Sequence, residues 1–192
     1  MKKRIGLLGG SFDPPHFGHL KISTEAIRKL KLFEVWWVIA LQNPLKPSGS
    51  SANFTKRFNN SKLFTANHKK IKISDIERQN NINFSIDSIN RLKNNFNNID
   101  FIWLMGADNF AQFHNWKQWH QIMGKIPIVV FNRPGFSYKA LTSRAAYYYK
   151  KYRVKGQTQP MNKLSPPKWM FLWQINESIS STKIRKITEG KK

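Results

Sequence analysis

Two histidines lie three residues apart near the N-terminus, among neighbours suited to holding phosphate. The segment reads Gly9-Gly-Ser-Phe-Asp-Pro-Pro-His-Phe-Gly-His19, and its histidines are His16 and His19. Gly9 and Gly10 carry no side chain, so their backbone amides can approach a phosphate closely. His16 and His19 fall near the start of a predicted helix, whose dipole favours anions. This pattern indicates chemistry on a phosphorylated ligand.

A second pattern suited to anions stands near the other end of the chain, in Ile179-Ser-Ser-Thr-Lys-Ile-Arg185. Ser180, Ser181 and Thr182 are N-cap candidates whose hydroxyls and amides could bind an anion at the start of an expected helix. Arg185 lies one turn further on and can direct its guanidinium to the same place. By itself this pattern is typical of a plain helix cap.

The residue types available argue against covalent catalysis. The chain has no cysteine, which excludes a thiolate nucleophile, a thiolate metal site and a disulfide scaffold. No serine stands beside a base in a nucleophile elbow. Catalysis is therefore expected to consist mainly of positioning and charge stabilisation.

Alternating apolar runs and helical spacings predict the elements that position these residues. The predicted strands cover residues 3–9, 34–41, 70–76, 100–105, 126–131 and 169–175. Helices are predicted at 18–32, 54–68, 85–96, 115–123 and 138–150, and from about residue 180, with a loop at 43–50. Strands that alternate with helices predict an α/β class protein with a Rossmann-like, doubly wound parallel sheet of about six strands.

Ligands of such a fold bind outside the carboxyl ends of the strands, where both patterns above fall. With 192 residues the chain is expected to form a single domain over 1–192. Residues 135–168 are the least regular and form a candidate mobile insertion. No window reaches the roughly 18 apolar residues of a membrane span, and no secretory signal is recognised, so we expect a cytoplasmic protein.

Positive charge dominates the composition, with 33 Lys and Arg against 10 Asp and Glu. Residues 109–176 contain eleven Lys or Arg and no acidic residue. Lysines interleaved with Tyr147–Tyr149 and Tyr152 could track and stack a nucleic acid. Abundant Asn, Lys, Ile and Phe offer another explanation, because AT-rich codons alone raise the charge.

Taken together, the two terminal motifs carry a resemblance to a known family. The string GGSFDPPHFGH matches the HxGH signature of the adenylyl- and cytidylyltransferases, and ISSTKIR matches their ISSTxIR. The extended form resembles the bacterial nicotinate-nucleotide adenylyltransferases, over residues 4–188. The resemblance implies an enzyme of NAD biosynthesis that transfers AMP from ATP to nicotinate mononucleotide, giving nicotinate adenine dinucleotide and pyrophosphate.

The resemblance also implies roles for individual residues. His16 and His19 are expected to be catalytic. The expected ATP ligands are Gly9, Gly10, Ser11, Phe12, Gly18, Asp108, Ile179, Ser181, Thr182 and Arg185, with Asp108 accepting from the ribose hydroxyls. The expected ligands of nicotinate mononucleotide are Lys46, Phe84, Ser85, Trp116 and Arg133.

The implied reaction needs no activated protein nucleophile. The 5′-phosphate of the mononucleotide is itself anionic and can attack the α-phosphorus of ATP in line, expelling pyrophosphate. Mg²⁺ is expected with ATP, bound through phosphates and water rather than protein side chains. The expected partners are therefore these small molecules, with no membrane and no nucleic acid, while a homo-oligomer is left open.

Other families explain the sequence less completely. Pantetheine-phosphate adenylyltransferase shares the terminal motifs. Its helix start and the surroundings of its GxD motif, which corresponds to Gly106-Ala-Asp108 in this sequence, differ. A nucleic-acid-binding protein would explain the charge without explaining the motifs, and an aminoacyl-tRNA synthetase fragment of this length has no room for a tRNA-recognition domain. The sequence departs from the resembled family in two places. Many members continue beyond the ISSTxIR motif into a C-terminal helix, whereas this sequence stops at Lys192, seven residues after Arg185. Residues 147–168 match none of the family's motifs.

Overall fold

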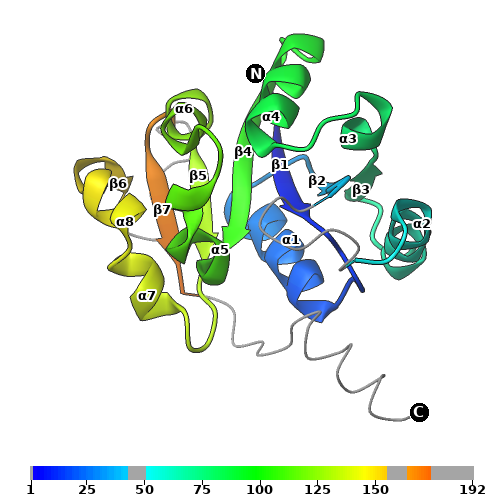
Figure 1. Ribbon diagram of the computed structural model, residues 1–192, viewed down its shortest axis with the longest axis horizontal. Coiled ribbons are helices and arrows are strands. Elements are labelled where there is room, and N and C mark those ends of the chain that lie inside the picture. Colours follow the sequence, from blue (N-terminus) through cyan, green and yellow to red (C-terminus); the bar gives the residue numbers. More distant parts are fainter. Residues whose placement is uncertain (1, 43–50, 155–163, 174–192) are drawn as a thin grey trace.

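The fold is built on one parallel sheet with helices on both faces (Figure 1). The structure is a computed structural model that describes residues 2–42, 51–154 and 164–173. Its strands are β1 (Lys3–Gly10), β2 (Glu34–Ile39), β3 (Ile71–Ser74), β4 (Ile99–Gly106), β5 (Ile128–Phe131), β6 (Arg153–Val154) and β7 (Trp169–Leu172). They follow the order β3-β2-β1-β4-β5-β7-β6, with every neighbouring pair parallel. The predicted doubly wound α/β fold is confirmed.

The strand count is a correction, since the sheet has seven strands where six were predicted. The additional strand is β6, whose Arg153 and Val154 pair with Trp169 and Met170 at the edge of the sheet. A two-residue edge strand contains no apolar run, so the sequence pattern could not indicate it.

The helices also differ from the predicted boundaries. They are α1 (Phe17–Lys29), α2 (Phe54–Phe64), α3 (Ile76–Gln79), α4 (Ser85–Asn95), α5 (Ala107–Ala111), α6 (Trp119–Lys125), α7 (Ser137–Leu141) and α8 (Arg144–Tyr148). Two 3₁₀ turns, η1 (Phe113–Asn115) and η2 (Lys150–Tyr152), complete the set. The predicted strand 70–76 ends at Ser74 and gives way to α3, and the helix predicted over 138–150 is broken by Ser143, whose side chain caps α8. The helix expected from about residue 180 lies outside the described residues.

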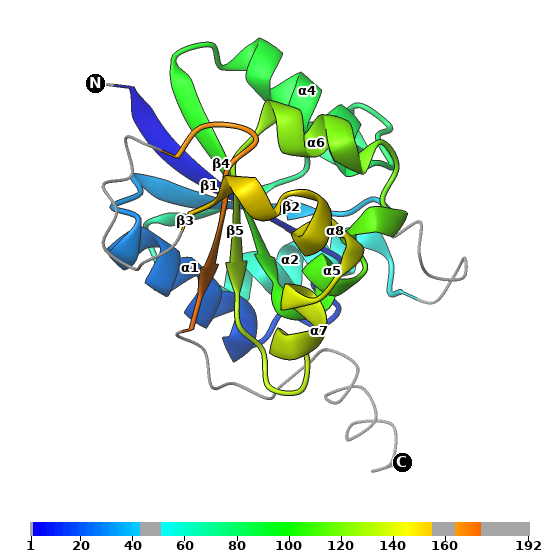
Figure 2. The ribbon, with the colours of Figure 1, turned by 90° about the vertical axis from the view of Figure 1, so that its left-hand side faces the viewer.

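The sheet separates two apolar clusters, which explains why its central strands read as continuous apolar runs. One cluster contains side chains of α1 and partly buried side chains of α2. The other contains side chains of α4, α5, α6 and α8. Figure 2 shows α1 on one side of the strands and α4 with α6 on the other. Because both faces are covered, ligands can reach the sheet only at its ends.

Residues 135–154 of the expected insertion are ordered into α7, α8, η2 and β6. Ala140, Ala145 and Ala146 are buried in the core on the α4 side of the sheet. This part therefore belongs to the domain core. In the described residues, no helix has the length and apolar character needed to cross a membrane.

Leu104→Ala should lower the free energy of unfolding by about 2–5 kcal/mol, because Leu104 is fully buried on the central strand β4 and its loss leaves a cavity. Leu63→Ala is the matched control: Leu63 is 76% exposed on α2, so its loss should cost within about 0.5 kcal/mol. Urea unfolding of both variants measures the difference, and equal costs would contradict the assigned core.

Candidate active site

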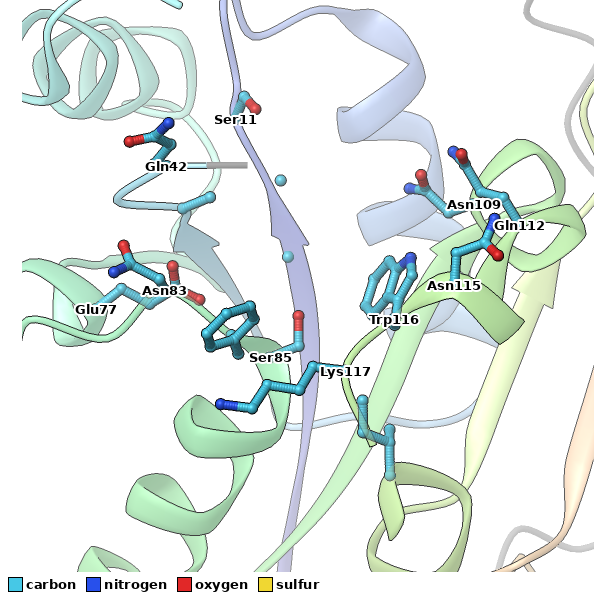
Figure 3. A pocket seen from close by; sticks show the side chains of 15 residues that line it. Ser11, Gln42, Glu77, Asn83, Ser85, Asn109, Gln112, Asn115, Trp116 and Lys117 are labelled. Atoms are coloured by element: carbon cyan, nitrogen blue, oxygen red, sulfur yellow. The ribbon is translucent and has the colours of Figure 1, made fainter. Parts of the chain in front are cut away.

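A cavity of about 570 Å³ opens beyond the carboxyl ends of β1 and β2, where the fold predicts a ligand site (Figure 3). Trp116 stands on one side of it, and Glu77 and Asn83 stand on the opposite side. The lining residues come from the end of β1, from loops and from helices: Gly9, Gly10, Ser11, Ala40, Gln42, Glu77, Asn83, Phe84, Ser85, Asn109, Gln112, Asn115, Trp116, Lys117 and Ile122.

Six of the residues expected to bind ligands line this cavity together: Gly9, Gly10, Ser11, Phe84, Ser85 and Trp116. His16, His19, Phe12, Gly18, Asp108 and Arg133 are described but are not among the lining residues. Lys46, Ile179, Ser181, Thr182 and Arg185 lie outside the described residues. The structure thus brings Phe84 and Ser85, at the start of α4, and Trp116, which directly follows η1, to the glycine-rich end of β1.

The two histidines form a reciprocal cap at the start of α1. His16 is the N-cap residue, and its Nδ1 accepts from the backbone N–H of Gly18 at 3.1 Å. The backbone N–H of His16 donates to Nδ1 of His19 at 3.3 Å. An Nδ1 that accepts a hydrogen bond cannot carry a hydrogen, so each neutral ring carries its hydrogen on Nε2. The cap therefore supplies two Nε2–H donors, with ring centroids 3.8 Å apart.

Burial keeps both rings neutral in the free protein. Burial lowers the pKa of His16 to about 4, with a smaller contribution from the positive charge of Arg133. Burial also lowers the pKa of His19 well below its usual value, and His16 and Arg133 act in the same direction. At neutral pH the histidines are hydrogen-bond donors without a net charge.

Two buried aromatic side chains, Phe12 and Trp37, help to hold His19 in place. Phe12 is 1% exposed and packs against both His19 and Trp37, with 4.6 Å between ring centroids in each pair. Trp37 Nε1 donates to Ser23 Oγ, and Ser23 donates to the carbonyl of His19. The side chain of Phe12 thus belongs to the core, so only its backbone is placed to contact a ligand. Phe12 has a φ of +48°, which is uncommon outside glycine.

Asp108 and Arg133 form an ion pair beyond the ends of β4 and β5, through Oδ2 and Nη1. The other carboxylate oxygen of Asp108, Oδ1, is buried and has no hydrogen-bond partner within the described residues. A Cβ at Gly106 would lie 2.5 Å from this oxygen, so the carboxylate requires glycine there. We expected Arg133 beside the pyridine subsite, and the structure places its guanidinium on the carboxylate of Asp108.

The cavity combines an aromatic surface with one cation and one anion. Trp116 meets Trp103 edge to face, and the Nε1 atoms of both rings are buried without a partner in the part of the chain that is described. Lys117 Nζ lies 4.1 Å from the ring centroid of Phe84, and Lys117 is the one lysine or arginine among the lining residues. The anion is Glu77, which already accepts hydrogen bonds from Ser88 and from the backbone of Leu41.

Sequence reasoning missed several lining residues. Lys117 and Asn109 directly follow the predicted ligands Trp116 and Asp108, and this adjacency was a usable signal. Glu77 stands between a predicted strand and a predicted helix, in a segment for which no element was predicted. The amide side chains of Gln42, Asn83, Gln112 and Asn115 have no distinguishing spacing in a chain rich in asparagine, and only the fold brings them together.

Comparisons with known proteins identify the family of the chain. The cytidylyltransferase-like family model matches residues 7–187. The chain is 41% identical to the "Probable nicotinate-nucleotide adenylyltransferase" of Ruegeria sp. (strain TM1040), across 95% of this chain and 96% of that protein. It is 36% identical to the protein of the same name from Brucella suis biovar 1 (strain 1330), across 95% and 94%.

A solved structure shares the fold at lower identity. It is the Plasmodium falciparum nicotinic acid mononucleotide adenylyltransferase complexed with NaAD, with a TM-score of 0.71 and 22% identity. The match covers 96% of this chain and 83% of that one.

The neutral histidine pair predicts a particular dependence of stability on pH. The unfolded chain, with a histidine pKa of about 6.5, binds more protons than the folded chain between pH 6.5 and about 4. The free energy of unfolding should therefore fall as the pH falls through this window, by up to about 1.4 kcal/mol per pH unit for each histidine.

His16→Asn is the matched variant, because asparagine can still cap α1 but does not titrate. Denaturant unfolding between pH 7 and pH 4 should show a shallower loss of stability for the variant. Parallel curves for the two proteins would contradict the assigned pKa of His16.

Proposed function

The chain belongs to the cytidylyltransferase-like family, and from the geometry of its site we propose how it performs its reaction. It is a nicotinate-nucleotide adenylyltransferase, a nucleotidyltransferase that makes nicotinate adenine dinucleotide in NAD biosynthesis. ATP supplies the adenylyl group. The function predicted from the two terminal motifs is confirmed.

The observation that supports the proposed mechanism best is the reciprocal cap of His16 and His19. Its two Nε2–H groups stand at the N-terminus of α1, next in the chain to the glycine-rich turn that lines the cavity. We assign these donors to phosphate oxygens of ATP, where the helix dipole also favours negative charge. Donors fixed before the substrate binds need no reorganisation as charge develops.

The reaction is a direct displacement in this mechanism. A 5′-phosphate oxygen of nicotinate mononucleotide attacks the α-phosphorus, and the bond from that phosphorus to the bridging oxygen breaks. The electron pair leaves with pyrophosphate, so negative charge grows on the bridging oxygen. His16 and His19 stabilise that charge through their Nε2–H groups, while their Nδ1 atoms keep accepting from the backbone of α1.

Two further groups of residues are assigned to ATP, one to its ribose and one to its phosphates. Asp108 Oδ1, buried and without a partner within the described ranges, accepts from the ribose hydroxyls in our proposal. Arg133 holds the other oxygen and compensates the charge. The β- and γ-phosphates are proposed to bind Ser181, Thr182 and Arg185. Two further proposed ATP ligands are Ile179, at the start of the same motif, and Gly18, in the first turn of α1.

The cavity itself is assigned to nicotinate mononucleotide. Trp116 offers its indole face to the pyridine ring, and Ser85 lies at the first turn of α4, whose backbone amides favour a carboxylate. Lys117 adds a cation beside Phe84. Lys46 is proposed to reach the 5′-phosphate. The carboxylate of nicotinate mononucleotide thus meets the positive N-terminus of α4 and the ammonium group of Lys117. The neutral amide of nicotinamide mononucleotide would gain less binding energy from both groups.

Mg²⁺ accompanies ATP in this proposal and is bound through phosphates and water. In the described residues there is no group of three or more His, Cys, Asp or Glu side chains able to hold a metal ion. We also propose that the enzyme acts in the cytoplasm.

His19→Ala should lower kcat by about 100-fold or more, because it removes a donor aimed at charge that grows in the transition state. The KM for ATP should change far less. His68→Ala, remote in sequence from both motifs, is the control and should leave kcat unchanged. Pyrophosphate release at saturating substrates measures the effect, and wild-type kcat in His19→Ala would refute the assignment.

The enzyme should show a higher kcat/KM for nicotinate mononucleotide than for nicotinamide mononucleotide. Lys117→Met should reduce that ratio by about 10-fold, since a hydrogen bond to a charged group is worth about 1.5–3 kcal/mol. Lys125→Met is the control, because Lys125 is exposed and does not line the cavity. A ratio unchanged by Lys117→Met would remove Lys117 from the carboxylate subsite.

A further inference from the structure

Arg57 is a buried arginine that the proposed mechanism leaves without a role. It lies on α2 and is 3% exposed, and every hydrogen bond assigned to its guanidinium goes to a backbone carbonyl. Nη1 donates to Ser11 and to Ala40, each at 2.8 Å. Nη2 donates to Leu41 at 3.1 Å, and Nε donates to Ala52 at 2.8 Å.

These carbonyls belong to the turns that build the active site. Ser11 directly follows β1, while Ala40 and Leu41 directly follow β2. Beyond its last paired residues, a strand has no ladder partner for its carbonyls, so the guanidinium supplies donors to partly buried carbonyls that the sheet leaves unpaired. Ser11 and Ala40 line the cavity, and Gln42 lines it next to Leu41 (Figure 3).

Glu77 secures the same region from the other side of the chain. Its Oε2 accepts from the backbone N–H of Leu41 at 3.0 Å, and its Oε1 accepts from Ser88 Oγ at 2.7 Å. The peptide groups of Leu41 are therefore held by Glu77 through nitrogen and by Arg57 through oxygen. Because Ser88 lies one turn into α4, the carboxylate also joins β2 to the helix that begins at Ser85.

The two buried charges compensate each other. Burial raises the pKa of the Glu77 carboxyl, and the Ser88 hydroxyl, the Leu41 N–H and Arg57 all oppose that shift. Burial lowers the pKa of the Arg57 guanidinium, and Asp13 and Glu77 oppose it. Asp13 adds a further tie, since its Oδ2 accepts from the backbone of Ala52. Removing Arg57 would take away the positive charge that opposes the burial of Glu77, whereas removing Glu77 would leave Asp13 to oppose the burial of Arg57.

We propose that Arg57, together with the Glu77 carboxylate that binds Leu41 and Ser88, is a positioning residue that fixes the phosphate-binding end of β1 against the mononucleotide-binding end of β2. The proposal rests on the proposed function, because the two ends carry the two reacting substrates. The attacking phosphate and the α-phosphorus must be aligned in the reaction. A displacement of about 1 Å between their binding loops can cost about 100-fold in rate.

Arg57→Lys tests this role, because lysine keeps the charge but cannot reproduce the planar fork that reaches carbonyls of three segments. We expect kcat to fall by about 100-fold. The dissociation constant of each substrate alone, followed by tryptophan fluorescence, should change only a few-fold, because each half-site survives. A variant that was merely less folded would instead lose binding capacity in proportion to kcat.

Arg78→Lys is the matched control. Arg78 also lies 5.4 Å from the ring centroid of Phe54, as Arg57 does, but it is exposed, and within the described residues it donates to the side chain of Thr55. Its kcat should equal that of the wild type.

Glu77→Gln provides a second test, and its kcat should also fall; this result stands alone if Arg57→Lys does not fold. Where Arg57→Lys folds, the double variant should be no slower than Arg57→Lys alone, because the two residues act as one unit. A folded Arg57→Lys or Glu77→Gln with wild-type kcat would overturn the positioning role. A wild-type protein that releases no pyrophosphate in the same assay would instead overturn the proposed reaction.

Discussion

The geometry of this site depends on the pair of hydrogen bonds that His16 and His19 exchange with the first turn of α1. A helix N-terminus leaves backbone N–H groups unsatisfied, and most proteins cap them with serine, threonine or aspartate. Here imidazole nitrogens cap them, so the need to satisfy the backbone also decides which nitrogen carries the hydrogen. A requirement of folding thereby prepares the donors that adenylyl transfer uses.

The buried ionisable groups of the site are either neutral or opposed by a group of opposite charge. Burial keeps the histidines uncharged, Asp108 is paired with Arg133, and Glu77 is opposed by Arg57. Lys117 is the one lysine or arginine among the described residues that line the cavity, and no ion pair joins it to an acidic residue of this lining. The large positive charge of the chain as a whole contributes at most by attracting the polyanionic substrates, an effect that salt screens.

The sequence predicted the parallel α/β fold and six of the seven strands, because buried strands are continuous apolar runs and the motifs lie at strand ends. It missed β6, which exists only through pairing with β7. It also missed Arg57 and Glu77, since an isolated charge in a predicted helix, or between two predicted elements, resembles a surface residue. One signal was present for Arg57: Phe54, Arg57 and Phe58 share one helical face, and a charge on an apolar face needs buried partners.

Nitrogen-15 NMR of the imidazole rings in the substrate-free enzyme tests the central claim most directly. Specific labelling of histidine, with His16→Asn and His19→Asn used for assignment, reports the protonation of each ring nitrogen against pH. We predict that both rings are neutral at pH 7, with hydrogen on Nε2 and none on Nδ1, and that neither titrates near its usual pKa. A ring with hydrogen on Nδ1, or one that becomes protonated near pH 6.5, would contradict the account.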